Sequence, residues 1–119
     1  MPATTTLVDD YIAMWNEPDA ERRRVLVQRT VSDDATYIDP LMSGEGSDGI
    51  DAMIAGAQEQ YPGHSFKLIA GPDEHHGRVR FSWSLASGSG DVIAVGHDFA
   101  TLTSDGRMSS ITGFLDAPA

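Results

Sequence analysis

Asp39 is the first candidate for proton chemistry. It precedes the final proline of the segment 33–40, whose sequence is Asp-Asp-Ala-Thr-Tyr-Ile-Asp-Pro. The alternation is typical of a strand, and residues two apart on a strand share a face, which places Asp39 beside Tyr37. Pro40 removes a backbone donor and favours an extended residue before it, so the strand is expected to end with Asp39 at its rim. Asp39 is then either an acid or base next to apolar side chains, or a cap of the following turn in water.

Asp98 is the second candidate, because it lies in a segment from Val92 to Leu102 that is largely apolar on both faces. Burial there would penalise the ionised carboxylate and raise its pKa. An acid held neutral can donate a hydrogen bond while a carboxylate elsewhere in the site removes a proton. The alternative is a structural acid paired with a neighbouring strand or a histidine. His97 should point to the opposite face, unless a bulge near Gly96 changes the register.

Tyr11 is the third candidate, one helical turn before Trp15 and therefore on the same face. A buried phenol needs a partner for its hydroxyl, and a backbone carbonyl would serve as well as a reacting group. The sequence contains no motif that indicates a metal site or a nucleotide-binding site. The loop 43–49 contains glycines but no lysine of the phosphate-binding type, and metal-ligand spacing is missing from the histidines, which are His64, His75, His76 and His97.

Three helical patterns supply the elements that position these residues. The first runs from a capping Thr6 to about Asn16. Asp19 caps the second, in which Val25 and Leu26 are expected to face inward and the arginines 22–24 to form a solvated side. The third follows a flexible loop over 44–48, and the longer loop from Leu41 to Asp48 is a candidate lid. The apolar stripe of this helix is Ile50, Met53, Ile54 and Ala57.

From residue 65 onward the period changes from helical to two, which indicates strands. A break is expected at 71–74, and turns are expected at 87–90 and 104–106. Helices followed by a run of hairpins predict an α+β fold with the helices packed on one face of an antiparallel sheet. Gly96 and Gly113 favour a sheet that curls around the helices and encloses a pocket.

Composition limits the classes of function. The chain has 119 residues, typical of one domain over 1–119, and no cysteine. Its 18 acidic residues against 8 basic ones give a net charge of -10, which disfavours nucleic acid and anionic membranes as partners. Neither a signal peptide nor a membrane-spanning apolar run is visible, so a soluble, cytoplasmic protein is expected.

The chain resembles the NTF2-like superfamily, and within it the SnoaL-like and ketosteroid-isomerase-like branches. The resemblance rests on the motifs Tyr-Ile-Ala-Met-Trp-Asn at 11–16, Pro-Asp at 18–19, the segment 33–40, Gly-Ile at 49–50 and the closing Gly-Phe at 113–114. It covers nearly the whole chain and implies a cone of three helices inside a curved sheet, often dimerised through the outer face of the sheet. It implies little about activity, because the superfamily includes enzymes and proteins that only bind.

Carried over to this sequence, the resemblance implies that Asp39 is a general base and that Tyr11 is an oxyanion-hole tyrosine. Asp98 matches the protonated oxyanion-hole acid, although an anchor on Phe99 would place His97 there instead. Trp15 and Trp83 make the walls of the expected pocket bulkier than a flat steroid site needs, so a steroid is not the expected substrate. The aromatic residues expected to contact the substrate are Trp15, Tyr37, Phe66, Phe81, Trp83 and Phe114.

Two functions follow from these residues. The first is an isomerase or SnoaL-like cyclase that moves a proton next to the carbonyl of a small apolar substrate, with no cofactor. The second is a non-catalytic binder of a small apolar ligand that keeps the cone but not the chemistry. A homodimer is expected in both cases, since only one face of the segment from Val92 to Leu102 can serve the pocket.

Overall fold

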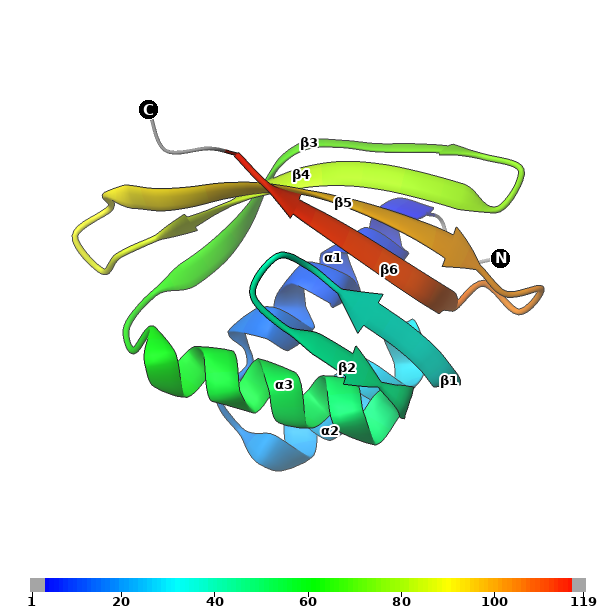
Figure 1. Ribbon diagram of the computed structural model, residues 1–119, viewed down its shortest axis with the longest axis horizontal. Coiled ribbons are helices and arrows are strands. Elements are labelled where there is room, and N and C mark those ends of the chain that lie inside the picture. Colours follow the sequence, from blue (N-terminus) through cyan, green and yellow to red (C-terminus); the bar gives the residue numbers. More distant parts are fainter. Residues whose placement is uncertain (1–3, 117–119) are drawn as a thin grey trace.

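The computed structural model describes residues 4–116. In this part of the chain the strands form one curved sheet that covers α1, while α2 and α3 form a layer on the far side of α1 (Figure 1). The elements are α1 (Thr4–Asn16), α2 (Ala20–Thr30), β1 (Val31–Ile38), β2 (Ser43–Glu45), α3 (Gly46–Gln60), β3 (Ser65–His75), β4 (Arg78–Ala86), β5 (Val92–Leu102) and β6 (Met108–Leu115).

The sheet is mixed, with the strand order β2-β1-β6-β5-β4-β3. Neighbouring strands are antiparallel except β1 and β6, which run parallel. The expectation of an antiparallel sheet is therefore wrong at this one pair. The chain leaves β1, passes through α3 and the hairpins β3 to β5, and returns beside β1. Parallel neighbours need such a crossover connection, because a short hairpin joins only antiparallel strands. The parallel pair brings the end of β1 next to the middle of β6.

Helix α1 packs one face into the curve of the sheet because its apolar residues recur at helical spacing. Leu7, Val8, Tyr11, Met14 and Trp15 are all buried. Among the described residues the helix begins at Thr4, two positions earlier than its expected cap Thr6. The capping of α2 agrees with the sequence, since the Asp19 side chain accepts a hydrogen bond from the backbone N–H of Arg22.

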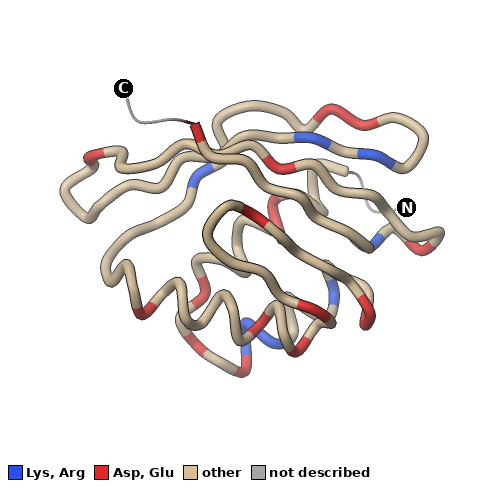
Figure 2. The backbone as a smooth tube through the Cα atoms, in the orientation of Figure 1, with Lys and Arg blue, Asp and Glu red and all other residues tan. Residues whose placement is uncertain are grey.

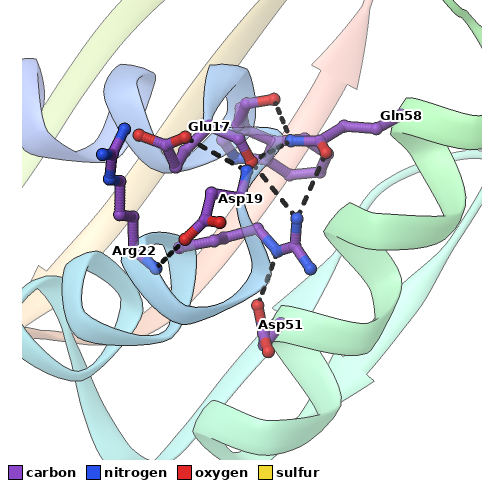
Figure 3. A network of polar contacts seen from close by, with 7 residues as sticks. Glu17, Asp19, Arg22, Asp51 and Gln58 are labelled. Atoms are coloured by element: carbon purple, nitrogen blue, oxygen red, sulfur yellow. Dashed lines mark hydrogen bonds and ion pairs between the residues drawn. The ribbon is translucent and has the colours of Figure 1, made fainter.

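The arginine run of α2 is not wholly solvated, contrary to expectation. Arg23 is buried, and its guanidinium pairs with Asp51 of α3 at 2.7 Å and also donates to Gln58. The amide of Gln58 in turn donates to the backbone carbonyl of Glu17, so a polar network ties α3 to the corner between α1 and α2 (Figure 3). Val25 is 59% exposed, and Val27 is the buried valine of this helix.

Two strand boundaries also differ from the sequence-based expectation. The expected loop after β1 contains the short strand β2, which pairs with β1. Strand β3 runs through the expected break at 71–74, because register shifts between Leu68 and Asp73 let it stay paired with β4. Such bulges accommodate a proline without ending a strand.

Charged residues are spread over helices, strands and turns (Figure 2). Among the residues described, no helix is long and apolar enough to cross a membrane. The same residues hold no cluster of three or more histidine, aspartate or glutamate side chains arranged to bind a metal ion.

Candidate active site

A cavity of about 120 Å³ lies between the inner face of the sheet, α1 and the end of α3. Leu41 and Ile93 are 67% and 50% exposed, so they mark where it reaches solvent. Apolar side chains dominate the wall, and the lining residues are Tyr11, Ile12, Trp15, Tyr37, Asp39, Leu41, Met42, Ala57, Tyr61, Phe66, Trp83, Leu85, Ile93, Ala94, Asp98 and Leu115.

The deep polar group of this cavity is a pair formed by Asp98 of β5 and Tyr11 of α1. The Tyr11 hydroxyl donates to Asp98 Oδ2 at 2.7 Å, and the two residues are 1% and 3% exposed, respectively. Asp98 Oδ1 is buried and has no hydrogen-bond partner among the described residues. A buried acceptor left without a donor is costly, which makes this oxygen the site's unfilled hydrogen-bonding position.

Burial raises the pKa of Asp98 from its ordinary value of 3.8 to about 6, against the opposing effect of the Tyr11 hydrogen bond. The nearby Asp39 carboxylate raises it further. Burial, followed by the charge of Asp98, also raises the pKa of Tyr11 well above 10. Tyr11 therefore stays a hydrogen-bond donor near neutral pH, and Asp98 takes up a proton more readily than an ordinary aspartate.

A second pair of the same residue types lies at the rim, where β1 ends. The Tyr37 hydroxyl donates to Asp39 Oδ2 at 2.6 Å. The backbone N–H groups of Leu41 and Met42 donate to Asp39 Oδ1 at 2.8 and 2.9 Å. These three donors stabilise a negative charge on Asp39, which is half-buried. Asp39 thus caps the turn that follows β1, and it also lines the cavity. The two alternatives drawn from the sequence, a turn cap and an acid beside apolar side chains, are therefore both met.

The two pairs meet over Gly113 of β6, directly opposite Asp98 in the sheet. A Cβ built on Gly113 would lie 2.9 Å from Asp98 Oδ1. The same Cβ would lie 3.1 Å from Asp39 Cβ and 3.4 Å from the Tyr37 hydroxyl oxygen. Only a glycine lets both acids approach this point of the sheet without displacing one of them.

Aromatic side chains make up much of the cavity wall. The ring of Phe66 lies 5.3 Å from that of Trp15 and 5.2 Å from that of Trp83, measured between centroids. The indole of Trp83 lies against Gly96, its cross-strand partner, where any Cβ would overlap the ring. Gly96 therefore lets Trp83 lie flat along the sheet and fill part of the cavity.

Of the residues expected in the site, Tyr11, Asp39 and Asp98 come together, and Trp15, Tyr37, Phe66 and Trp83 line the same cavity. Phe81 does not line it, but packs against Tyr11 with ring centroids 5.1 Å apart.

His97 and Phe114 lie outside the cavity, because side chains alternate along β5 and β6 and the inward positions belong to Asp98 and Gly113. His97 thus points to the opposite face from Asp98, as the alternation predicts, and the alternative anchor on Phe99 is wrong. The expectation that Phe114 lines the pocket is also wrong. Phe114 is 62% exposed on the outer face. His97 contacts the Ser82 hydroxyl and the Asp116 carboxylate on that face, each at 2.7 Å.

Sequence reasoning missed several apolar residues of the wall. Leu41 and Met42 follow Asp39 directly, and the hydrogen-bonding ability of an Asp-Pro turn was the signal that tied them to the site. Ile93 and Leu115 come from strand ends that curve over the cavity, and no local pattern in the sequence distinguishes them from other strand residues.

These elements make up the α+β cone of the NTF2-like proteins. Solved structures of this fold resemble the chain along nearly all its length. A SnoaL-like protein from Jannaschia sp. CCS1, provisionally described as a polyketide cyclase, shares 18% identity over 94% of this chain and 86% of its own, with a TM-score of 0.71. An NTF2-like protein of unknown function from Cytophaga hutchinsonii shares 16% identity over 98% of this chain and 92% of its own, with a TM-score of 0.69.

The chain belongs to the SnoaL-like family. It shares 46% identity, over 95% of its length and 97% of the other chain, with a SnoaL-like family protein from Agrobacterium tumefaciens provisionally described as an isomerase, and the TM-score is 0.91. The resemblance found in the sequence and the expected cone of three helices are confirmed. Comparison with protein-family models gives no match, and comparison with curated proteins gives none either.

Proposed function

We propose that this protein is a cofactor-independent isomerase or cyclase that moves a proton next to a carbonyl group. The observation that carries the proposal is the pair of aspartates facing one apolar cavity, one hydrogen-bonded at the rim and one deeply buried. The provisional description of the Agrobacterium relative as an isomerase supports the same class of reaction.

Asp39 is the proposed base, acting through Oδ2. A carboxylate oxygen accepts about two hydrogen bonds. Oδ1 already receives two from the backbone, whereas Oδ2 receives one from Tyr37 and keeps a lone pair free. In the proposed step the substrate C–H bond breaks, the proton moves to Oδ2, and the electron pair passes into the carbonyl to form an enolate.

Asp98 and Tyr11 are the proposed partners of the enolate oxygen. An entering apolar substrate displaces water and increases the desolvation of Asp98, which favours its neutral form. The protonated carboxyl then donates from Oδ1 to the developing negative charge, and Tyr11 holds Asp98 through Oδ2. An isomerase returns the proton to another carbon, and a cyclase lets the enolate carbon attack a second carbonyl of the same molecule.

The alternative is a binder of small apolar ligands without catalysis. The observation in its favour is that the hydroxyls of Tyr11 and Tyr37 already donate to carboxylates, so neither has a free O–H to offer a substrate. In both cases we propose a homodimer formed through the outer sheet face, where Phe99 and Phe114 are 44% and 62% exposed.

Isomerisation of 3-cyclohexen-1-one to its conjugated isomer tests the proposal, because the product absorbs in the ultraviolet and needs only proton transfer. The protein should accelerate the reaction over buffer in the presence of a metal chelator. Gly113→Ala is the control: it changes no ionisable group, but its Cβ displaces Asp98, and it should lower the rate at least tenfold. Equal rates with and without the protein would leave the binder as the better account.

A further inference from the structure

We propose that the cavity selects uncharged carbonyl compounds of about one six-membered ring, and that Trp83 sets this limit on size. The inference rests on the proposed function and names the class of substrate for that site. It excludes fused polycyclic compounds and carboxylates of the same size.

Volume is the first argument. The cavity measures about 120 Å³. An engineered apolar cavity of roughly 150 Å³ in another protein holds one benzene molecule. A single ring with a carbonyl oxygen therefore occupies the available space. A second fused ring would extend into solvent at the opening beside Leu41 and Ile93, where it would lose contact with the wall.

Charge is the second argument. Among the described residues, those lining the cavity include two aspartates and no lysine, arginine or histidine. The whole chain carries a net charge of -10. An anionic ligand would meet two carboxylates without a cation to pair with, in surroundings where water screens poorly. An uncharged ligand avoids this penalty.

The buried oxygen of Asp98 is the third argument, because it fixes which end of the ligand is polar. Asp98 Oδ1 has no hydrogen-bond partner among residues 4–116, and apart from Asp39 and Asp98 the side chains that line the cavity are aromatic or aliphatic. When Asp98 is protonated, a carbonyl oxygen completes this position by accepting its hydrogen bond. The ring of the ligand then lies towards Trp15, Phe66 and Trp83.

Trp83 is the residue that limits the length of the ligand. Its indole lies along the sheet over Gly96 and faces Phe66, so it fills the space into which a second ring would extend. A shorter side chain at this position should open that space while the Tyr11 hydroxyl still donates to Asp98. Phe99 offers a matched control, since it is an aromatic residue of the outer face.

Intrinsic fluorescence reads the binding directly, because the sequence has two tryptophans and both line the cavity. Three probes separate the arguments: cyclohexanone, cyclohexanecarboxylate and the bicyclic ketone 2-decalone. Without a size limit the hydrophobic effect would make 2-decalone bind at least about tenfold more tightly than cyclohexanone. We expect the reverse order in the native protein, and binding of the carboxylate at least tenfold weaker than that of cyclohexanone.

Trp83→Leu should improve 2-decalone binding at least tenfold relative to cyclohexanone, with Trp15 as the remaining reporter, and Phe99→Leu should leave the order unchanged. Trp83→Phe makes the same test with a smaller change of volume if the leucine variant does not fold. Tighter binding of 2-decalone or of the carboxylate by the native protein would overturn the inference. Binding is measured without turnover, so a protein that shows this order but no isomerisation contradicts the proposed function alone.

Discussion

The two aspartate–tyrosine pairs of the cavity consist of the same residues in opposite surroundings. Asp39 and Tyr37 stand at the end of a strand, where two backbone N–H groups add to the hydrogen bond from the phenol. Asp98 and Tyr11 lie in the core, where the phenol is the carboxylate's one hydrogen-bond donor among the described residues. Depth and the number of hydrogen-bond donors, and not residue type, therefore distinguish the proposed base from the proposed acid.

The largest expected effect comes from removing the proposed base. Asp39→Asn keeps the shape of the side chain but not its basicity, and positioned proton transfer contributes about a hundredfold to ten-thousandfold. We expect the exchange of α-protons of cyclohexanone for deuterium, followed by proton NMR, to slow by at least a hundredfold. An Asn variant with a native circular dichroism spectrum and undiminished exchange would remove Asp39 from the mechanism.

Asp98→Asn should change how the stability of the protein depends on pH. The pKa of Asp98 is raised from 3.8 to about 6 in the folded protein. The folded state thus binds the proton more tightly than the unfolded chain, and wild-type stability falls as pH rises from about 4 to about 6. This loss is on the order of 3 kcal/mol at full ionisation.

Urea unfolding at pH 4 and pH 8 measures this difference. The Asn variant cannot ionise, so relative to the wild type it should gain up to about 3 kcal/mol between the lower and the higher pH. The uncharged amide of the Asn variant lowers its stability by the same amount at both pH values, so this cost cancels in the difference. Parallel pH curves for the two proteins would show that Asp98 is not an acid of raised pKa.

The two phenols should differ in their contribution to stability. Tyr11→Phe removes the 2.7 Å hydrogen bond to the buried Asp98, and loss of a hydrogen bond to a charged group typically costs about 1.5–3 kcal/mol. Tyr37→Phe leaves Asp39 with its two backbone donors and access to water, so we expect about 1 kcal/mol or less. Chemical denaturation at pH 8 compares them, and equal losses would contradict the difference in surroundings.

The smallest effect on activity is expected on the outer face. Phe114 is 62% exposed in the isolated chain, and Phe114→Glu places a charge at the proposed dimer interface. We expect light scattering to show a dimer for the native protein at micromolar concentration and a monomer for the variant, with turnover within about twofold of native. A native monomer would contradict the proposed homodimer.

Local patterns in the sequence predicted those parts of the site that depend on neighbours along the chain. Pro40 placed Asp39 at the rim because a proline ends a strand. The apolar spacing of α1 placed Tyr11 and Trp15 on one face, and the resemblance to a family supplied the cone that brings them near the sheet.

Contacts between distant segments could not be predicted in this way. The burial of Arg23 depends on Asp51, which lies on another helix. The parallel pairing of β1 with β6 depends on the whole intervening chain. Phe114 was expected in the pocket because aromatic residues favour such walls, but the register puts Gly113 inward, where a side chain would collide with Asp98.

Carboxyl carbon NMR titration of Asp98 tests the difference between the two pairs most directly. With ¹³C-labelled aspartate and Asp98→Asn to assign the signal, the account predicts a midpoint near pH 6 for the native protein. Because coupled acids titrate together, the same signal is followed in Asp39→Asn, where loss of the neighbouring charge should lower the midpoint but leave it above the ordinary value. A midpoint near 3.9, the value of an unperturbed aspartate, would contradict the division of roles on which the proposed mechanism rests.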